Sequence, residues 1–377
     1  MKNPIYLPHE PVRFTHEDFD RLLAYCHHLG ASDITLQTGE PVYAEIHGRL
    51  NKITRRNLTN AEVGEMLNNI YGPNGTTQLL SGHDVDTHYE HRPSRAERFR
   101  FRVNGTACQV AGHPGIQITM RVIPCEPPTL AELELQPGIL KAIAPQQGVV
   151  YVTGATGSGK STLLASIIRE LAEEPESNRK ILTYESPIEF VYDAIEKHSA
   201  LVCQSEIPRH IQSFAAGVRN ALRRKPMAIL VGEARDPETI LAVIEAALTG
   251  HPVYTTLHTN GVAETIRRLV TSFPRDERNS RTVDIIETIR LSVWQKLVPT
   301  VDGRRVALRE YLAFDEEIRD ILLSSDPDLI TATTRKLVRE RGQPMLIDAE
   351  KKYKAGIIAE REYNLLVAGA KLAEKDY

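Results

Sequence analysis

The sequence predicts an α/β protein with two domains: an α+β domain at the N-terminus and a larger domain built on a parallel sheet. The chain has 377 residues, which is more than one hydrophobic core usually organises. Up to Pro124 it is dominated by strand-like alternation of apolar and polar residues. From Gly148 onward, short apolar strands alternate with segments of helical periodicity, which is typical of a parallel sheet flanked by helices.

The N-terminal domain is expected to combine a helix with several strands. Apolar residues at helical spacing predict a helix over residues 14–29, with Thr15 as its N-cap. Residues 34–50 are typical of short strands interrupted by turns, and residues 97–110 and 116–123 are typical of half-buried strands.

Arginines at every second position mark one face of the strand around residue 100. Phe99 and Phe101 lie on the opposite face, so we expect Arg98 and Arg100 to be exposed to solvent. Cations on the outer face of an alternating strand need no functional explanation.

A proline-rich segment marks the boundary between the two domains. The stacked prolines of residues 124–128 stiffen the chain toward an extended form and exclude a helix there. We therefore expect an N-terminal domain at residues 1–124, a linker at 125–133 and a second domain at 134–377.

The second domain shows a regular alternation of strands and helices. After Glu264 the pattern becomes mostly helical, apart from a hairpin turn at residues 301–304. We expect strands at 148–153, 180–184, 228–231 and 253–258, and helices at 160–171, 211–224 and 237–248.

The composition excludes several classes of protein. A net charge of -3 gives no general attraction to nucleic acid or to anionic lipid. No apolar run approaches the length of about 20 residues that a spanning helix needs, and none near the N-terminus has signal-peptide length, so we expect a cytoplasmic protein. The four cysteines are scattered, and we expect buried, reduced thiols rather than disulfides or a zinc site.

The strongest signal in the chain is a phosphate-binding loop at residues 154–161, which fits the pattern G-x-x-x-x-G-K-[ST] between a strand and a helix. Glycines let backbone N–H groups wrap phosphates, Lys160 can reach the β- and γ-phosphates, and the Ser161 hydroxyl can bind Mg²⁺. The expected ligands are ATP and Mg²⁺. The residues expected to hold the nucleotide are Gly154, Thr156, Gly157, Ser158, Gly159, Lys160, Ser161 and Thr162.

Three segments after the loop carry acids or histidines at strand ends. Residues 182–190 run from a strand into a turn with two carboxylates, residues 228–236 form a buried strand ending in an acid, and residues 249–260 form a strand bracketed by histidines. Together they resemble the Asp box, Walker B motif and His box of the type II/type IV secretion ATPases. Residues 31–34 and 98–104 resemble the N-terminal domain of that family, and the resemblance extends to residues 342–345.

The resemblance implies a PAS-like α+β N-terminal domain linked to a RecA-like P-loop ATPase domain with a helical C-terminal part, assembled as a homo-hexamer. The short N-terminal domain and the absence of a four-cysteine insertion are similar to the retraction-type, PilT-like ATPases. Two departures from that type are Ser186, where an Asp is usual, and residues 225–227, which replace Asp-Pro-Asp. These details resemble the ATPases of type IVB (Dot/Icm-like) secretion systems.

The resemblance also assigns roles to three residues at strand ends. Glu185 corresponds to the general base that polarises the attacking water; alternatively it caps a turn before a proline. Glu233 corresponds to the Walker B acid that reaches Mg²⁺ through water; alternatively it is a solvated strand end. His258 corresponds to the histidine that senses the γ-phosphate, whereas a lone histidine is more often structural. Glu189 is a weaker candidate, and His251 suits a subunit contact.

Two arginines on the strands of the N-terminal domain complete the expected site. Arg102 and Arg121 match arginines that reach the phosphates in this family, and such a charge is worth about 10³ to 10⁵ in rate. The alternative is that both are solvent-facing cations. If the match holds, closing the N-terminal domain onto the nucleotide switches catalysis.

The resemblance implies a hexameric ATPase motor energising a type IVB secretion system. Its partners would be further copies of itself, a membrane-associated secretion ATPase (DotO-like) and other machine components, which would recruit it peripherally to the inner membrane. A basic cluster at residues 219–225 lacks interleaved aromatics, so we expect no nucleic-acid partner. The alternatives are a pilus retraction motor, an ATP-gated docking scaffold and a RecA-like DNA translocase.

Overall fold

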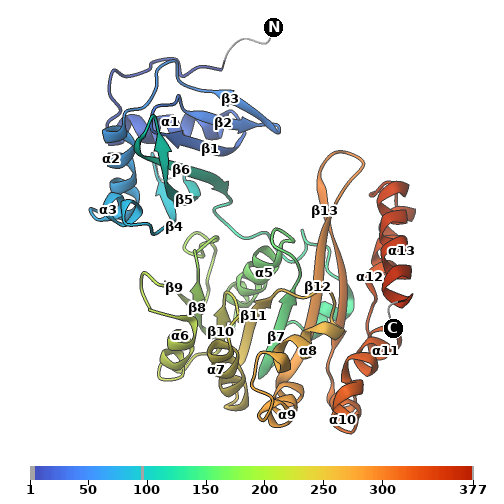
Figure 1. Ribbon diagram of the computed structural model, residues 1–377. Helices are drawn as coiled ribbons and strands as arrows, with labels where there is room; N and C mark the ends of the chain where they lie inside the picture. The colour runs from blue at the N-terminus through green and yellow to red at the C-terminus, as the bar shows by residue number, and fades with distance from the viewer. Residues whose placement is uncertain (1–4, 95–96, 376–377) are drawn as a thin grey trace. The chain divides into compact units, whose positions relative to one another are not determined.

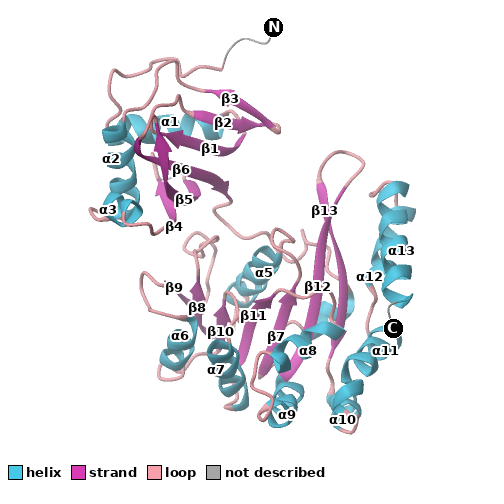
Figure 2. Ribbon diagram, in the orientation of Figure 1, coloured by secondary structure: helices cyan, strands magenta, loops and turns pink. Residues whose placement is uncertain are grey.

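The computed structural model describes residues 5–94 and 97–375, which form two compact units, each described here by itself. The first unit comprises residues 1–126 together with Pro187–Val191. The second comprises Pro127–Ser186 and residues 192–377. Within the expected domains, residues 1–4, 95, 96, 376 and 377 lie outside the described residues. Figure 2 distinguishes the helices and strands of both units by colour.

The first unit is built on an antiparallel sheet of six strands in the order β3-β2-β1-β6-β5-β4 (Figure 1). Its strands are β1 (Ala31–Gln37), β2 (Tyr43–Ile46), β3 (Arg49–Lys52), β4 (Val85–His91), β5 (Phe99–Val110) and β6 (His113–Ile123). Its helices are α1 (His16–His28), α2 (Asn60–Tyr71) and α3 (Gly75–Leu80). Apolar side chains of the helices and of one sheet face form one core, so the unit has the α+β architecture that the sequence predicted.

Capping boxes start the first two helices of this unit. Thr15 accepts a hydrogen bond from the backbone of Asp18, whose carboxylate accepts from the Thr15 backbone in return, so the predicted N-cap is confirmed. These bonds from Thr15 lower the pKa of Asp18. Thr59 and Glu62 repeat the arrangement at the start of α2, a helix that we did not predict.

The expectation that Arg98 and Arg100 are exposed is wrong. Their side chains are 16% and 0% exposed, respectively. The physical reason is that other segments of the first unit cover the polar face of β5. Arg100 donates to the Ile188 carbonyl oxygen at 3.0 Å, and the Cys125 thiol donates to the Arg98 carbonyl oxygen at 3.2 Å. Alternation along the strand therefore placed the arginines on the correct face but did not show that this face is covered.

The second unit is built on a sheet of seven strands in the order β13-β12-β7-β11-β10-β8-β9 (Figure 1). All neighbouring pairs are parallel except β12 and β13. The strands are β7 (Gly148–Thr153), β8 (Lys180–Glu185), β9 (Leu201–Glu206), β10 (Ala228–Val231), β11 (Pro252–Leu257), β12 (Ile289–Pro299) and β13 (Arg305–Ala313). The predicted hairpin is confirmed, but its two long strands extend the sheet, which the sequence did not reveal.

Helices pack on both faces of this sheet. Val149 and Tyr151 of β7 belong to a core with helices α6 to α11, whereas the alternate residues of β7 point to the other face. Helix α5 contacts β7 and β11. The helices are α4 (Pro137–Ala142), α5 (Lys160–Glu173), α6 (Phe214–Ala221), α7 (Pro237–Leu248), α8 (Ala263–Thr271), α9 (Arg278–Thr288), α10 (Glu316–Leu323), α11 (Ile330–Arg341), α12 (Met345–Lys354) and α13 (Glu360–Lys375).

Composition led to two further expectations, one about the cysteines and one about membrane-spanning helices. Cys26 is a buried thiol, but Cys108, Cys125 and Cys203 are only half-buried, so the expectation of buried thiols is wrong for these three. Within residues 5–94 and 97–375, no helix has both the length and the apolar character needed to cross a membrane.

Glu62 gives this fold a pH-dependent element. Its carboxylate is 3% exposed and accepts hydrogen bonds from Arg56, Thr59 and the Phe14 backbone. Burial raises its pKa, but these donors outweigh burial and bring the pKa to about 2. Because this value lies below the ordinary 4.5, the ionised carboxylate stabilises the folded state at neutral pH, and this contribution is lost as the pH falls from 4.5 toward 2.

We expect Glu62→Gln to lower the free energy of unfolding by about 2 kcal/mol at pH 7, with a smaller difference from the wild type at pH 3. Urea unfolding of both proteins at the two pH values measures this. Glu65→Gln is the matched control, because Glu65 lies on the same helix and forms an exposed ion pair with Arg13. An equal loss in both variants, or a loss independent of pH, would contradict the assignment.

Candidate functional site

Four parallel strands bring the predicted active-site residues of the second unit to one edge of its sheet. Strands β7, β11, β10 and β8 are adjacent and parallel, so their carboxyl ends lie at the same edge (Figure 1). The phosphate-binding loop follows β7, His258 follows β11, Glu233 follows β10, and Glu185 ends β8. Segments separated by up to a hundred residues in the sequence are thereby gathered beside the loop.

The phosphate-binding loop has the backbone shape that its glycines predict. Gly154, Gly157 and Gly159 have φ values of 142°, 75° and 83°, which favour glycine. Lys160 begins α5 and is 8% exposed, and its ammonium group donates to the carbonyl oxygens of Gly154 at 2.9 Å and Ala155 at 2.8 Å. A buried ammonium group thus lies at the N-terminus of a helix, directly after a glycine-rich loop, an arrangement suited to an anion.

Gln295 of β12 supports the loop, a role that the sequence did not reveal. Its amide donates to the Ser158 carbonyl oxygen at 2.6 Å and accepts from the Arg309 guanidinium at 2.8 Å. A Cβ atom on Gly154 would lie 2.3 Å from the Gln295 carbonyl oxygen, so glycine is needed for this close approach. Burial lowers the pKa of Arg309 to about 10, so its guanidinium stays charged at neutral pH. Only knowledge that residues 289–299 join the sheet would have identified Gln295.

Glu233 and His258, which follow neighbouring strands, form a pair. The His258 ring lies 3.4 Å from the Glu233 carboxylate, and their side chains are 48% and 29% exposed. Strands β10 and β11 are tied together at this point, because the Thr256 hydroxyl donates to the Gly232 carbonyl oxygen at 2.6 Å. Both side chains are therefore oriented at the sheet edge and accessible to a ligand.

Glu185 is held in place by two neighbours. One carboxylate oxygen accepts hydrogen bonds from the Thr183 hydroxyl at 2.7 Å and from the Gln204 amide at 3.1 Å. Thr183 belongs to the same strand, whereas Gln204 lies on β9, a strand that the sequence pattern did not predict. The side chain is only partly buried. These contacts orient the carboxylate while leaving it accessible to water.

Arg102 and Arg121 belong to the first unit, where they lie opposite each other on neighbouring strands β5 and β6. Arg102 donates to the Asp86 carboxylate at 2.8 Å and lies 3.4 Å from that of Glu189, and these acids help to raise its pKa. Arg121 donates to Asp33 at 2.9 Å and is 68% exposed. Two cations are thus presented side by side on one face of the sheet.

His251 lies at the other edge of the sheet of the second unit, at the amino end of β11. Its ring bonds the Ala246 carbonyl oxygen at 3.1 Å and the Thr249 hydroxyl at 3.2 Å, which close the turn after α7. In the basic cluster, Arg219 pairs with Glu238 at 2.7 Å.

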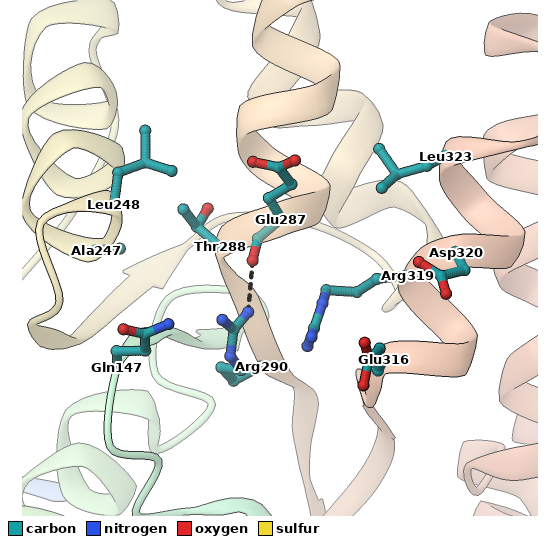
Figure 3. A pocket seen from close by; sticks show the side chains of 10 residues that line it. All are labelled: Gln147, Ala247, Leu248, Glu287, Thr288, Arg290, Glu316, Arg319, Asp320 and Leu323. Atoms are coloured by element: carbon teal, nitrogen blue, oxygen red, sulfur yellow. Dashed lines mark hydrogen bonds between the residues drawn. The ribbon is translucent and has the colours of Figure 1, made fainter.

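Two cavities of the second unit differ in their position relative to the loop. The larger, of about 330 Å³, lies at the amino edge of the sheet, where Arg290 and Arg319 point toward a common space in Figure 3. It is remote from the loop, so we do not regard it as the nucleotide site. The smaller, of about 250 Å³, adjoins the loop helix and is lined by Glu132, Leu133, Glu134, Gly159, Thr162, Leu163, Gln295, Leu297, Arg305, Val306, Ala307, Arg309 and Lys352.

The side chains near the loop fit Mg²⁺ as a bound ion. Ser161 exposes its hydroxyl in the first turn of α5, and Glu233 offers a carboxylate nearby in the sheet order. Across residues 5–94 and 97–375, no three His, Cys, Asp or Glu side chains are placed to hold a metal by themselves. This donor set suits an ion that takes many of its oxygen ligands from a nucleotide and water, as Mg²⁺ does.

Known proteins share this architecture. The family described as "Type II/IV secretion system protein" matches residues 18–342. The crystal structure of the Legionella pneumophila ATPase DotB is 66% identical, with a TM-score of 0.92, and covers 98% of this chain and 100% of that one. The retraction ATPase PilT of Pseudomonas aeruginosa is 35% identical over 81% of this chain and 85% of its own length. A structure of the pilus retraction motor PilT with bound ADP is 30% identical, with a TM-score of 0.79, over 91% and 95% of the two chains.

The family match spans most of the chain, and the similarity to DotB covers both units. The fold therefore consists of an N-terminal domain and a RecA-like ATPase domain, as in these relatives. The chain belongs to the type II/IV secretion system protein family and is a DotB-type ATPase within it.

Proposed function

We propose that this chain is the hexameric motor of a type IVB secretion system, and that it hydrolyses ATP at the carboxyl edge of its parallel sheet. The observation that carries the proposal is the convergence of the phosphate loop, Glu185, Glu233 and His258 on that edge. The high similarity to DotB supports the secretion assignment over its nearest alternative.

The loop supplies the binding site for the phosphates. Lys160 now donates to two carbonyl oxygens of the loop, and it would exchange these partners for the β- and γ-phosphates of ATP. The buried Ser158 hydroxyl has no hydrogen-bond partner among the described residues, which leaves it available for an entering ligand. The cavity beside α5 adjoins the loop at Gly159 and Thr162, where it would receive the part of the nucleotide that extends beyond the phosphates.

Glu185 is proposed as the general base. It would accept a proton from the attacking water as the oxygen of that water bonds to the γ-phosphorus and the bond to the β-phosphate oxygen breaks. Thr183 and Gln204 hold the carboxylate in the orientation from which it would act on the water. His258 would donate to the γ-phosphate, with Glu233 holding its ring.

Mg²⁺ would be held by the Ser161 hydroxyl and, through water, by Glu233. When bound, it would neutralise charge on the β- and γ-phosphate oxygens. Ser161 and Glu233 would fix the position of the ion, because Ser161 lies in the first turn of α5 and Glu233 follows directly after β10.

Arg102 and Arg121 are proposed to reach the phosphates when the N-terminal domain closes. Their present partners are the carboxylates of Asp86, Glu189 and Asp33, which a phosphate group can replace. Such closure would couple hydrolysis to movement of the domain and thus to work on the machine. The partners of the motor would be its own copies and a membrane-associated ATPase of the machine, DotO-like, which would recruit it to the cytoplasmic side of the inner membrane.

A second candidate function is pilus retraction, which the similarity to the Pseudomonas retraction ATPase favours. The two functions use the same chemistry and differ in the machine that is driven. Replacement of the chromosomal gene with a Glu185→Gln version distinguishes them: the secretion motor loses export of a reporter substrate and leaves surface motility unchanged. The reverse result would support retraction.

We expect Lys160→Ala to abolish tight ATP binding, because it removes the buried ammonium group from the loop. Glu185→Gln should retain ATP binding and lose turnover by at least about a hundredfold, because the base is removed while the shape is kept. Phosphate release and binding of a fluorescent ATP analogue, with oligomer mass recorded in parallel, measure these outcomes.

Glu245→Gln is the control for these variants, because Glu245 lies on the exposed side of α7. Turnover that persists in Glu185→Gln would remove Glu185 from the role of base. Tight binding without turnover in the wild type would favour a nucleotide-gated scaffold, and turnover stimulated by DNA would favour a translocase.

Gln295→Ala is expected to weaken binding of the ATP analogue by roughly tenfold, because the loop loses its support at Ser158 and the buried Arg309 loses a partner. Lys296→Ala, which changes the exposed neighbour on the same strand, should leave binding within about twofold of the wild type. Equal affinities in the two variants would show that Gln295 does not support the loop.

Arg102→Gln and Arg121→Gln are each expected to lower kcat by about 10³ if these arginines stabilise the charge of the transition state. Arg49→Gln is the control, because Arg49 is an exposed arginine on β3 of the same unit. Steady-state turnover at saturating ATP measures the effect. Wild-type kcat in both variants would leave the two arginines as surface cations.

A further inference from the structure

Directly after Glu185, the proposed base, a short segment of the chain belongs to the other unit. Residues 187–191, which we call the strap, belong to the first unit, although the residues on both sides of them belong to the second. A single residue, Ser186, separates Glu185 from the strap. Since neighbouring Cα atoms are about 3.8 Å apart, Ser186 cannot absorb a large displacement of the strap.

Arg100 of β5 holds the strap by its backbone. Its two terminal nitrogens donate to consecutive carbonyl oxygens, that of Ile188 at 3.0 Å and that of Glu189. Its Nε atom lies 3.3 Å from the carboxylate of Glu90, which balances the charge. The planar guanidinium group thus grips two neighbouring peptide groups at once, which the ammonium group of a lysine cannot do with the same geometry.

The burial of Arg100 makes this grip rigid. The side chain is 0% exposed, and a charge at such a depth is tolerated only when its hydrogen-bonding groups are paired. Movement of the strap away from β5 would remove acceptors from a guanidinium that water cannot reach. The Val191 amide, which donates to the Cys125 carbonyl oxygen at 3.4 Å, fixes the far end of the strap in the same unit.

The residues on both sides of the strap, Ser186 and Tyr192, lie near Glu185. Tyr192, the first residue after the strap, is 2% exposed. Burial and then the charge of Glu185 raise the pKa of its phenol well above the ordinary value, which reflects their proximity. Glu185 therefore accepts hydrogen bonds from Thr183 and Gln204 of its own sheet. The chain directly after it leads into the strap, which is hydrogen-bonded to Arg100.

We propose that Arg100 is a positioning residue for Glu185: through the strap, the first unit sets where the catalytic carboxylate stands. The inference rests on the proposed role of Glu185 as the base. It gives the N-terminal domain a second means of controlling hydrolysis, in addition to Arg102 and Arg121. The substrate is bound by other residues, so Arg100 should affect the chemical step and leave ATP binding unchanged.

The test is Arg100→Lys, which keeps the charge and loses the two-pronged grip. We expect kcat to fall about 10- to 100-fold, because a displacement of about 1 Å in a catalytic group has an effect of this size. The dissociation constant of a non-hydrolysable ATP analogue should remain within about twofold of the wild type. Phosphate-release assays on the full chain measure kcat, and titration with the analogue measures the dissociation constant.

Arg56→Lys is the matched control for general damage to the first unit. Arg56 also combines backbone acceptors, at Pro11 and Asn57, with a carboxylate, that of Glu62. It lies away from the strap, so Arg56→Lys should keep wild-type kcat even where its thermal midpoint falls as far as that of Arg100→Lys. An equal fall of kcat in both variants would overturn the proposal.

Pro187→Gly provides a second test that does not touch β5. It frees the backbone at the first residue of the strap, so kcat should fall with analogue affinity kept. This variant decides the matter if Arg100→Lys does not fold. Wild-type kcat in Pro187→Gly, or in a folded Arg100→Lys, would overturn the role of Arg100. Absence of turnover in the wild type, or its persistence in Glu185→Gln, would instead overturn the proposed function.

Discussion

The parallel pairing of β7, β11, β10 and β8 is the constraint on which the rest of the structure depends. Parallel strands need long crossover connections, and each connection here returns the chain so that the next strand ends at the same edge. The phosphate loop and three strand-end side chains are therefore neighbours without any direct link in the sequence. The N-terminal end of α5 and the N–H groups of the loop carry partial positive charge, which favours phosphate at this edge.

Around this edge, the polar groups of the second unit are arranged as supports for one another. Arg309 holds Gln295, Gln295 holds the loop at Ser158, and Gln204 holds Glu185. The supporting residues lie on strands β9, β12 and β13 at the two sides of the sheet, while the residues that they support lie toward its middle. A site held in this way loses little entropy when its ligand enters, because the orientations are set in advance.

The first unit carries arginines in contrasting environments. Its strand β5 carries arginines at alternate positions, and their environments separate their roles. Arg100 is buried and paired with backbone carbonyls, while Arg102 remains 40% exposed and Arg121, beside it, 68% exposed. The buried guanidinium can serve only as a fixed tether, whereas the exposed ones can change partners. The same residue type thus supplies a structural element and two candidates for transition-state stabilisation.

The sequence by itself determined the two-domain α/β class, the phosphate loop and the acids and histidine at strand ends, because these depend on local periodicity and on residue types at fixed spacing. It did not reveal β9, the extension of the sheet by β12 and β13, or the support residues Gln204 and Gln295, since their partners are distant in the chain. Burial of Arg100 was likewise decided by tertiary structure. Alternation shows which face a side chain occupies, but only the folded chain shows that a segment some ninety residues away covers that face.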